Sequence, residues 1–416
     1  MKRVVITGIG AVTPLAGTFY GSWERCKDGV TGIGAITRFD ASGLPWKVAG
    51  EIKDFSPGAY LSPKEVFRHD PFVQYAVAAS LMALEDAGLW NRTPEGGEPS
   101  LPGGFPDGAG VLIGSSRGGI STVEREMEKV RNPRSPRSFS PYLMPSSTIS
   151  MAASTVAQRT GLRGNCLGIS NACASGANAI GEAFRLIRSG VAPLLLAGGT
   201  EAPVCPLCVR GYGASGTLSK IEGPTASRPF DRTRDGFVIA EGAAVLVLEE
   251  LSSALQRGAQ MYGEIIGYSA TADAFHMTKP DPQGEARAIL SALKDAGIPP
   301  ESVEYINVHG TSTPLGDRAE AEAIGTVFGR RAEAIPASAL KSMTGHMLAA
   351  SGAFEAACTA MTLQEGVIPP SLHLLERDPG CPVALVTEKQ ETAARIAVTQ
   401  SFGFGGVNAV LVMKKA

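Results

Sequence analysis

The chain has 416 residues, of which 44% are hydrophobic and 19% are charged. Its 38 basic and 40 acidic residues leave a formal net charge of −2, which argues against a broad nucleic-acid-binding surface. The length allows a large core and two or three domains, and no apolar run approaches the ~20 residues of a membrane span. We therefore expect a globular protein that binds neither nucleic acid nor a membrane.

Short β-branched segments alternate with longer segments of helical periodicity along the whole chain. The predicted strands are residues 4–10, 110–116, 193–199, 243–250, 305–310, 395–401 and 408–415. The predicted helices are residues 72–88, 146–160, 174–189, 285–297, 317–328 and 347–365. Continuous apolar strands between helices predict an α/β fold whose sheets are covered on both faces. Residues 91–108, rich in Pro and Gly, and the basic stretch 131–141 are predicted to be irregular.

Two strand segments resemble each other in sequence. GAAVLVLEE (242–250) and NAVLVMKK (408–415) each follow a glycine-rich turn, EGA in one case and GFGG in the other. A strand-plus-turn unit that recurs near the middle and at the end suggests an internal duplication. We therefore predict two halves, residues 1–255 and 256–416.

The seven cysteines are scattered, and Cys205-Pro-Leu-Cys208 is their only paired spacing. A structural zinc site at this pair would need two further ligands, and the sequence has neither a second Cys pair nor a His-x-x-x-His motif. We expect a buried pair of thiols and no metal. Reduced thiols are typical of a cytoplasmic protein.

Cys173 lies where the apolar stretch 166–169 is followed by the predicted helix 174–189. Only the thiolate form of cysteine attacks well, and the unpaired N–H groups and dipole at a helix N-terminus lower a thiol's pKa. The small residues after Cys173, ASGA, leave room for a substrate. The alternative, a buried structural cysteine, is the ordinary state of a free thiol. The position favours a nucleophile.

Two of the five histidines lie at similar junctions. His309 ends a predicted strand and begins the polar turn HGTSTPLGD, and His346 lies in a Gly/Thr turn that opens the predicted helix 347–365. In α/β sheets, ligands bind at the carboxyl ends of strands, so such residues commonly face a cleft. Taken alone, each could be a structural histidine, as we expect for His69 and His373. Together with Cys173, they predict a catalytic group.

Four sequence motifs and several further blocks resemble a known enzyme family. NACASG at Cys173, NVHGTSTPLGD at His309, KSMTGHMLAASGAFEA at His346 and the closing SFGFGGVN resemble the β-ketoacyl-acyl-carrier-protein synthases of class II. Further blocks agree in order along essentially the whole chain, including VVITGIGAVTPL, RFDAS, MALEDAGL, SRPFDRTRDGFVIAEGAAVLVLEE and ADAFHMTKPDPQG. The resemblance implies a thiolase-like α-β-α-β-α fold with two mixed five-stranded sheets from a duplicated half. It also implies a homodimer.

The resemblance implies a decarboxylative condensation that needs no cofactor. Cys173 would accept an acyl group from an acyl carrier protein as a thioester, and malonyl-carrier protein would then lose its carboxylate. His309 and His346 would stabilise the resulting enolate, which attacks the thioester. The tetrahedral oxyanion would accept from the backbone N–H groups of Cys173 and Phe404. The lysine and glutamate that support this site in the family correspond to Lys341 and Glu355.

Further roles are carried over position by position. Phe404 would also gate the acyl pocket, substrate-binding positions would be Thr311, Thr313, Phe402 and Arg117, and carrier-protein contacts would be Lys64 and Arg68. Two positions depart from the family pattern. Arg117 replaces an aliphatic residue of the distal acyl pocket, where an unpaired guanidinium would be costly to bury. Either its side chain turns away, or it pairs with an acid such as Glu124 on the following helix, or the pocket serves a different acyl chain. Gly216 replaces an arginine on a second carrier-protein contact loop, which puts that surface in doubt.

Related activities differ from this pattern at single residues. Thiolases have a second catalytic cysteine near the C-terminus, and no cysteine follows Cys381 here. Class III synthases have asparagine in place of the second histidine, here His346, and chain-length-factor subunits lack the nucleophile, here Cys173. The sequence thus favours an elongating synthase of fatty-acid synthesis. A ketosynthase of a type II polyketide or polyene pathway, or a non-catalytic subunit that shapes a partner's pocket, are the alternatives.

Overall fold

The computed structural model describes residues 1–93, 97–101, 104–131 and 138–416. Its largest feature is a ten-stranded mixed sheet in the order β12-β11-β15-β16-β10-β1-β9-β8-β6-β7. The strands from the first half of the chain are β1 (Val4–Val12), β6 (Gly110–Gly114), β7 (Cys166–Ile169), β8 (Leu194–Glu201) and β9 (Gly242–Glu250). The strands from the second half are β10 (Gly263–Ala272), β11 (Tyr305–Asn307), β12 (Ala337–Ser338), β15 (Ile396–Gly403) and β16 (Val407–Lys414).

The two halves of this sheet have the same topology. Counted from the centre outward, each half runs through its own first, fifth, fourth, second and third strand. In both halves the two inner pairings are antiparallel and the two outer pairings are parallel. The halves meet where β1 and β10 pair antiparallel at Val4–Ile265, Val5–Glu264 and Ile6–Gly263. The two predicted five-stranded sheets are therefore present and joined at one edge by this short pairing.

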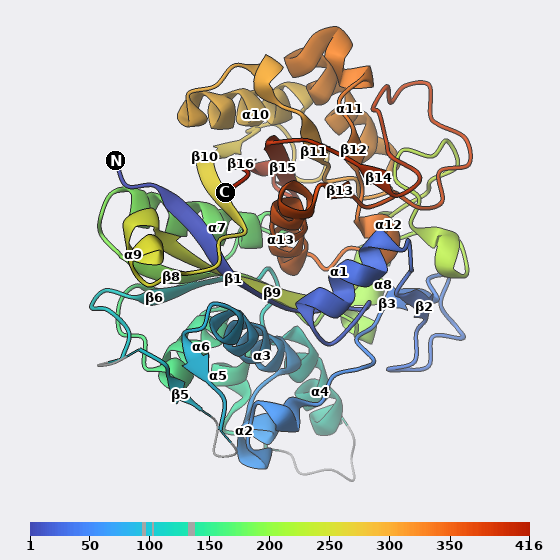
Figure 1. Cartoon of the computed structure of the whole chain (residues 1–416). Helices are drawn as coiled ribbons and strands as arrows, with labels where there is room; N and C mark the ends of the chain where they lie inside the picture. The colour runs from blue at the N-terminus through green and yellow to red at the C-terminus, as the bar shows by residue number, and fades with distance from the viewer. Residues whose placement is uncertain (94–96, 102–103, 132–137) are drawn as a thin grey trace.

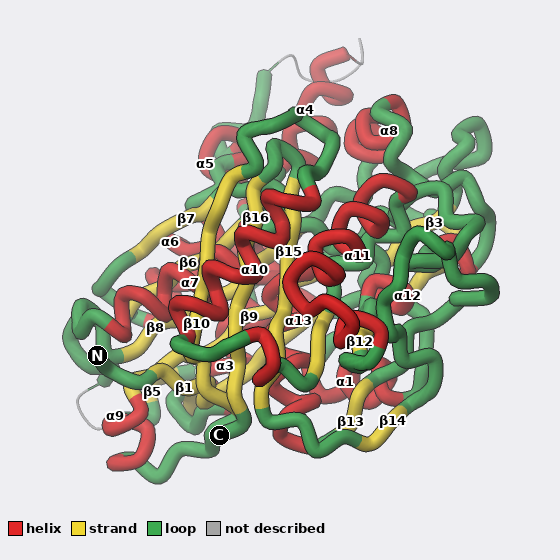
Figure 2. Tube along the Cα trace, turned by 90° about the horizontal axis from the view of Figure 1, so that it is seen from above, coloured by secondary structure: helices red, strands yellow, loops and turns green. Residues whose placement is uncertain are grey.

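Helices cover both faces of each half-sheet and complete five layers (Figure 1). Helices α3 (Pro71–Asp86) and α6 (Met151–Thr160) pack on the outer face of the first half. Helices α10 (Pro282–Ala296) and α11 (Pro314–Phe328) cover the outer face of the second half. Between the two half-sheets lie α7 (Ser175–Arg188) and α13 (Ala349–Glu365), which each contact strands of both halves. Figure 2 shows α10 lying across β10 and β16 on the outer face of the second half.

The middle layer is dense because its residues are small. Helix α13, AASGAFEAACTAMTLQE, is buried on all sides from Ala349 to Leu363, which is the pattern of a helix enclosed by protein. A Cβ atom added to Gly176 of α7 would lie 2.2 Å from the Ala349 oxygen, and one added to Gly199 of β8 would lie 2.3 Å from it. No side chain fits at either contact, so the starts of α7 and α13 are held rigidly against each other.

Most predicted elements are confirmed within a few residues. The single helix predicted over 146–160 is wrong, because α5 (Leu143–Ser147) ends where Thr148 adopts an extended conformation, at φ −72° and ψ 127°, and α6 begins only at Met151. Strand β10, whose apolar residues are interrupted by Gly and polar residues, was not predicted. The helix expected after Arg117, for which no bounds were predicted, is α4 (Ile120–Arg131). Parts of the predicted irregular stretches 91–108 and 131–141 lie outside the described residues.

The boundary predicted between residues 255 and 256 falls within helix α9 (Leu251–Gln256) and stays a prediction. In the described part of the chain, no helix is both long and apolar enough to cross a membrane. The described residues also contain no cluster of three or more His, Cys, Asp or Glu that would hold a metal ion. Cys205 and Cys208 are buried at the start of α8 (Pro206–Ala214).

Candidate active site

Cys173 and His346 occupy equivalent places in the two halves. Each lies in the connection between the third strand of its half and the following helix of the middle layer, β7 to α7 and β12 to α13. Each connection contains a non-glycine residue with positive φ, Ala172 at 46° and Leu348 at 47°. Such backbone strain costs about 1–3 kcal/mol and persists only where the surrounding structure enforces it. The duplicated topology therefore brings the two residues together at the dense middle layer.

One cavity of about 290 Å³ joins these connections. Its lining includes Cys173 and Tyr212 from the first half and His309, His346, Phe402 and Phe404 from the second. His309 follows β11 and is 7% exposed, and its ring centroid lies 5.5 Å from that of His346 in an edge-to-face arrangement. The structure thus brings the predicted nucleophile and both predicted histidines to one cavity.

A buried lysine fixes the His309 ring. Lys341 Nζ donates to the His309 carbonyl oxygen at 2.6 Å and to Glu355 Oε1 at 2.5 Å, and lies 3.3 Å from His309 Nδ1. An ammonium group has three hydrogens and accepts no hydrogen bond, so Nδ1 must be the acceptor in the third contact. The hydrogen of the neutral imidazole is therefore on Nε2. Although Lys341 is closer in sequence to His346, it contacts His309.

A serine fixes the His346 ring in the same sense. Ser351 Oγ accepts from the Met347 N–H at 2.9 Å and lies 3.2 Å from His346 Nδ1. His346 Nδ1 is the one acceptor that the described residues offer to the Ser351 hydroxyl hydrogen, so we assign this hydroxyl as the donor to Nδ1 and the imidazole hydrogen to Nε2. His346 Nε2 is buried and has no partner among the described residues. It is a donor held ready for a ligand.

Both histidines are uncharged near neutral pH. Burial lowers the pKa of His309 well below its ordinary value, and the positive charge of Lys341 and the neighbouring His346 lower it further. Burial and Lys341 lower the pKa of His346 in the same way. Near neutral pH each ring therefore stays uncharged and carries a single N–H donor.

The pKa of the Cys173 thiol is not lowered, although its position at a helix N-terminus predicts that it would be. Burial raises its pKa to about 11, and the carboxylate of Glu201 adds to this effect. Lys341, Arg117 and the backbone N–H of Phe404 act in the opposite direction. The predicted lowering of the pKa is therefore wrong for the free protein, because desolvation of the thiolate outweighs the favourable charges.

The GFGG turn closes around Cys173. A Cβ atom on Gly403 would lie 3.2 Å from the Cys173 nitrogen, so this turn approaches the nucleophile more closely than a side chain allows. The Phe404 ring lies 6.4 Å from that of Tyr212 across the cavity. The Gly405 N–H donates to the Met277 oxygen at 2.8 Å, which ties the turn to the loop before α10.

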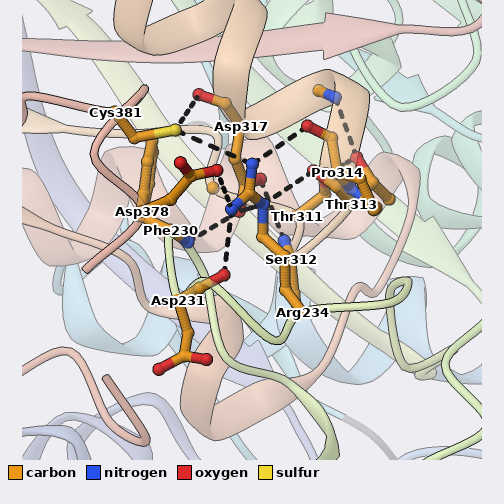
Figure 3. Close-up of polar contacts among 12 residues, drawn as sticks. Phe230, Asp231, Arg234, Thr311, Ser312, Thr313, Pro314, Asp317, Asp378 and Cys381 are labelled. Carbon is orange, nitrogen blue, oxygen red and sulfur yellow. Dashed lines mark hydrogen bonds and ion pairs between the residues drawn. The ribbon is translucent and has the colours of Figure 1, made fainter. Parts of the chain in front are cut away.

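A buried arginine, Arg234, holds the turn that carries Thr311 and Thr313 (Figure 3). Arg234 donates to the Thr313 oxygen at 3.2 Å and to the Pro314 oxygen at 3.0 Å, and its Nε lies 3.4 Å from Asp317 Oδ2. Asp317 in turn accepts from the Ser312 N–H at 3.0 Å. The pair thereby fixes the backbone that follows His309.

Thr311 and Thr313 both line the cavity, and their hydroxyl oxygens are 2.9 Å apart. Their mutual bond uses one of the two hydroxyl hydrogens, and the other is left for a ligand. Phe402 also lines the cavity, with its ring 5.8 Å from that of His309.

The remaining predicted positions lie outside the cavity lining. Arg117 Nε donates to the Tyr212 hydroxyl at 2.8 Å, so the guanidinium approaches the cavity through Tyr212. Glu124, the acid considered for pairing with it, instead accepts from the Leu207 N–H at 2.8 Å. Lys64 and Arg68 lie on helix α2 (Pro63–Arg68), where Arg68 stacks 4.8 Å above the Tyr142 ring.

Sequence reasoning missed several residues of the site. Neither Ser351, which contacts the His346 ring, nor Arg234, which holds the turn after His309, was identified. Glu320, which accepts from the N–H groups of His309 and Gly310 at 2.6 and 2.7 Å, lies on α11 between the buried Asp317 and the exposed Glu322. The only available signal was the acid-rich start of that helix, GDRAEAE, which does not reveal which carboxyl is buried.

Comparison with known proteins agrees with this geometry. Residues 1–254 match the family model for the β-ketoacyl synthase N-terminal domain, and residues 262–375 match that for the C-terminal domain. The chain is 44% identical over 421 residues to 3-oxoacyl-[acyl-carrier-protein] synthase 2 of Synechocystis sp., covering 100% of this chain and 98% of that relative. The enzyme of the same name from Staphylococcus aureus is 42% identical over 418 residues, with the same coverage.

Solved structures match the whole chain as well. The ishigamide ketosynthase/chain length factor has a TM-score of 0.92 at 33% identity, covering 100% of this chain and 99% of that one. A type II PKS acyl-carrier protein in complex with its ketosynthase bound to the hexaketide gives 0.89 at 33% identity, with 100% of each chain covered. A β-ketoacyl synthase from Burkholderia phymatum gives 0.90 at 34% identity, again with full coverage. The five layers are the thiolase-like fold of these ketosynthases, and the chain belongs to the β-ketoacyl synthase family.

Proposed function

We propose that the protein elongates an acyl chain by condensing it, as a thioester on Cys173, with malonyl-acyl-carrier protein. The products are 3-oxoacyl-acyl-carrier protein and carbon dioxide. The observation that carries this proposal is the pair of neutral histidines, each with Nδ1 held by a donor and Nε2–H available, in one cavity with a cysteine. Incubation with acyl- and malonyl-carrier protein, followed by mass spectrometry of the enzyme and the product, tests it.

The first step transfers the acyl group. Cys173 Sγ attacks the carbonyl carbon of the acyl thioester, and the bond from that carbon to the carrier sulfur breaks. Because burial keeps the pKa of Cys173 at about 11, the proton has to leave as the new bond forms. It ends on the departing carrier thiolate. Lys341 and Arg117 favour the negative charge that develops on Sγ.

The second step removes carbon dioxide from the malonyl group. The malonyl thioester oxygen accepts hydrogen bonds from Nε2–H of His309 and His346, which stabilise negative charge on that oxygen as the carboxylate leaves as carbon dioxide. The carbanion then attacks the Cys173 thioester carbon. The resulting oxyanion accepts from the backbone N–H groups of Cys173 and Phe404, and its collapse expels the Cys173 thiolate. Lys341 and Glu355 act by holding His309.

Two acyl classes have support from the comparisons. The full-length relatives named 3-oxoacyl-[acyl-carrier-protein] synthase 2 favour elongation in fatty-acid synthesis. The neighbour bound to a hexaketide keeps a type II polyketide pathway as the second candidate. The presence of Cys173 argues against a non-catalytic subunit. The carrier protein is the expected partner in either pathway, and we assign its docking to the basic residues Lys64 and Arg68 on α2. A cytoplasmic location stays a prediction.

Replacing Cys173 with alanine should abolish condensation, because it is the one thiol among the described residues that line the cavity. Malonyl decarboxylation should persist, since both histidines and the backbone donors remain. Loss of the acyl-enzyme mass and of 3-oxoacyl product, with carbon dioxide release retained, checks this. Cys26→Ala, outside the cavity lining, serves as the matched control and should keep condensing. Normal condensation by the Cys173 variant would remove this residue as the nucleophile.

His309→Ala and His346→Ala should each slow decarboxylation about 10²–10³-fold, the usual cost of losing one donor to a developing oxyanion. Acylation of Cys173 should continue in both, because the thioester forms without these donors. Release of labelled carbon dioxide and intact mass measure the two steps separately. His373→Ala, which does not line the cavity, should match the wild type in both assays. A variant at either cavity histidine that decarboxylates normally would contradict its assigned role.

We further infer a homodimer formed through β7. This strand is the last in the sheet and its residues Cys166–Gly168 are exposed, with Leu167 46% accessible, so it offers unpaired backbone groups and apolar surface to a second copy. Light scattering at micromolar concentration should give twice the chain mass of 43.2 kDa. A fully active monomer under these conditions would overturn the inference.

Arg117 should limit the acyl chain. We infer that its charge lies on the acyl side of the site, and two observations support this: its hydrogen bond to Tyr212, a residue of the cavity wall, and its lowering effect on the pKa of the Cys173 thiol. Arg117→Ile should extend the acyl length that the enzyme accepts and leave rates with short acyl chains nearly unchanged. A chain-length series with malonyl-carrier protein measures this, with Arg330→Ile as a surface control. Identical profiles for wild type and Arg117→Ile would refute it.

A further inference from the structure

Glu285 is a buried acid in the cavity wall that the proposed reaction does not use. It lies in the first turn of α10, is 1% exposed, and lines the same cavity as Cys173 and His309. Its Oε2 has no hydrogen-bond partner among the described residues. A buried carboxyl without partners destabilises the fold. Its presence in the wall of a ligand cavity therefore indicates that it binds a ligand.

The surroundings of Glu285 favour its uncharged form. Burial raises the pKa of its carboxyl well above the ordinary value, and the carboxylates of Glu320, Asp273, Asp281 and Asp317 raise it further. These acids come from α11, the end of β10 and the start of α10. Lys279 lines the cavity from the loop before α10. A protonated carboxyl offers one O–H donor and further acceptor positions.

This chemistry fits one part of a carrier-bound substrate. The malonyl carboxylate is an anion and is disfavoured beside four further acids. The pantetheine arm, in contrast, is neutral and carries secondary amides with one donor and one acceptor each. Thr311 and Thr313, in the same wall, supply a further hydroxyl hydrogen.

We propose that the Glu285 carboxyl is a substrate-binding group that hydrogen-bonds an amide of the pantetheine arm. The proposal rests on the function proposed above, because it takes the arm of a malonyl or acyl thioester as the ligand. It adds a recognition element for the arm beyond the threonine pair. Since the amide is remote from the reacting carbons, its loss should act on binding and not on the chemical step.

The test compares two malonyl thioesters, malonyl-pantetheine, which has amides, and the malonyl thioester of ethanethiol, which has none. Carbon dioxide release is measured for wild type, Glu285→Met and Glu285→Gln. Glu285→Met should lower kcat/KM for malonyl-pantetheine about 3- to 10-fold, the effect of one hydrogen bond, through KM. It should leave the ethanethiol thioester unchanged. Glu285→Gln, which keeps a donor and an acceptor, should retain most of the preference for malonyl-pantetheine.

Thermal unfolding distinguishes a substrate-binding role of Glu285 from a structural one, because replacing a structural residue would lower the unfolding temperature. Glu285→Met removes an unpaired buried polar group and should unfold at the same temperature as wild type or higher. Glu322→Ala, on the exposed side of α11, is the control and should match wild type throughout. Equal effects of Glu285→Met on both thioesters, or none on either, would overturn the proposal. If wild type releases no carbon dioxide from either thioester or from malonyl-carrier protein, the proposed function itself fails.

Discussion

The site depends on one buried cation. Lys341 is 1% exposed, and its three hydrogens meet the His309 carbonyl oxygen, His309 Nδ1 and Glu355 Oε1. Such a charge is tolerated in the interior only when a counter-ion and complete hydrogen bonding accompany it. The same contacts set the tautomer of His309. Burial lowers the pKa of that ring and the charge of Lys341 lowers it further, while the same charge opposes the raised pKa of Cys173. Removing Lys341 would therefore alter the histidine and the nucleophile together.

The duplicated topology explains why the catalytic groups meet. Each half sends its third strand into a helix of the middle layer, and these helices touch where Gly176 and Gly199 leave room for the Ala349 carbonyl. The connections ahead of the two helices are thus neighbours, although one half supplies a thiol and the other an imidazole. His309 reaches the same place from the adjacent parallel strand β11. The fold supplies the proximity, and different residues at equivalent positions supply the chemistry.

The sequence was sufficient for the layers and the principal site because both depend on local patterns. Apolar runs identify strands such as β9 and β16, and glycine-rich turns and quoted motifs identify the neighbourhoods of Cys173, His309 and His346. Properties that depend on burial in the folded protein could not be predicted from the sequence. The pKa of Cys173 was predicted in the wrong direction because the helix terminus is visible in sequence and the surrounding desolvation is not. The break at Thr148 and the partner of Arg117 likewise depend on tertiary contacts.

Desolvation favours the uncharged form of each group around the cavity, so it lowers the pKa of the two histidines and raises that of the thiol. It keeps His309 and His346 uncharged, as N–H donors to a developing oxyanion require, and it also keeps the Cys173 thiol protonated until substrate arrives. A protonated thiol is protected from unproductive reactions, at the cost of a proton that has to move during acyl transfer. Among the acids, burial raises the pKa of Glu320 to about 8, yet two backbone N–H groups oppose this shift, whereas the described part of the chain offers Glu285 no such donors. The difference between these two acids follows from their partners: Glu320 holds the turn of His309, and Glu285 is left with a carboxyl for a ligand.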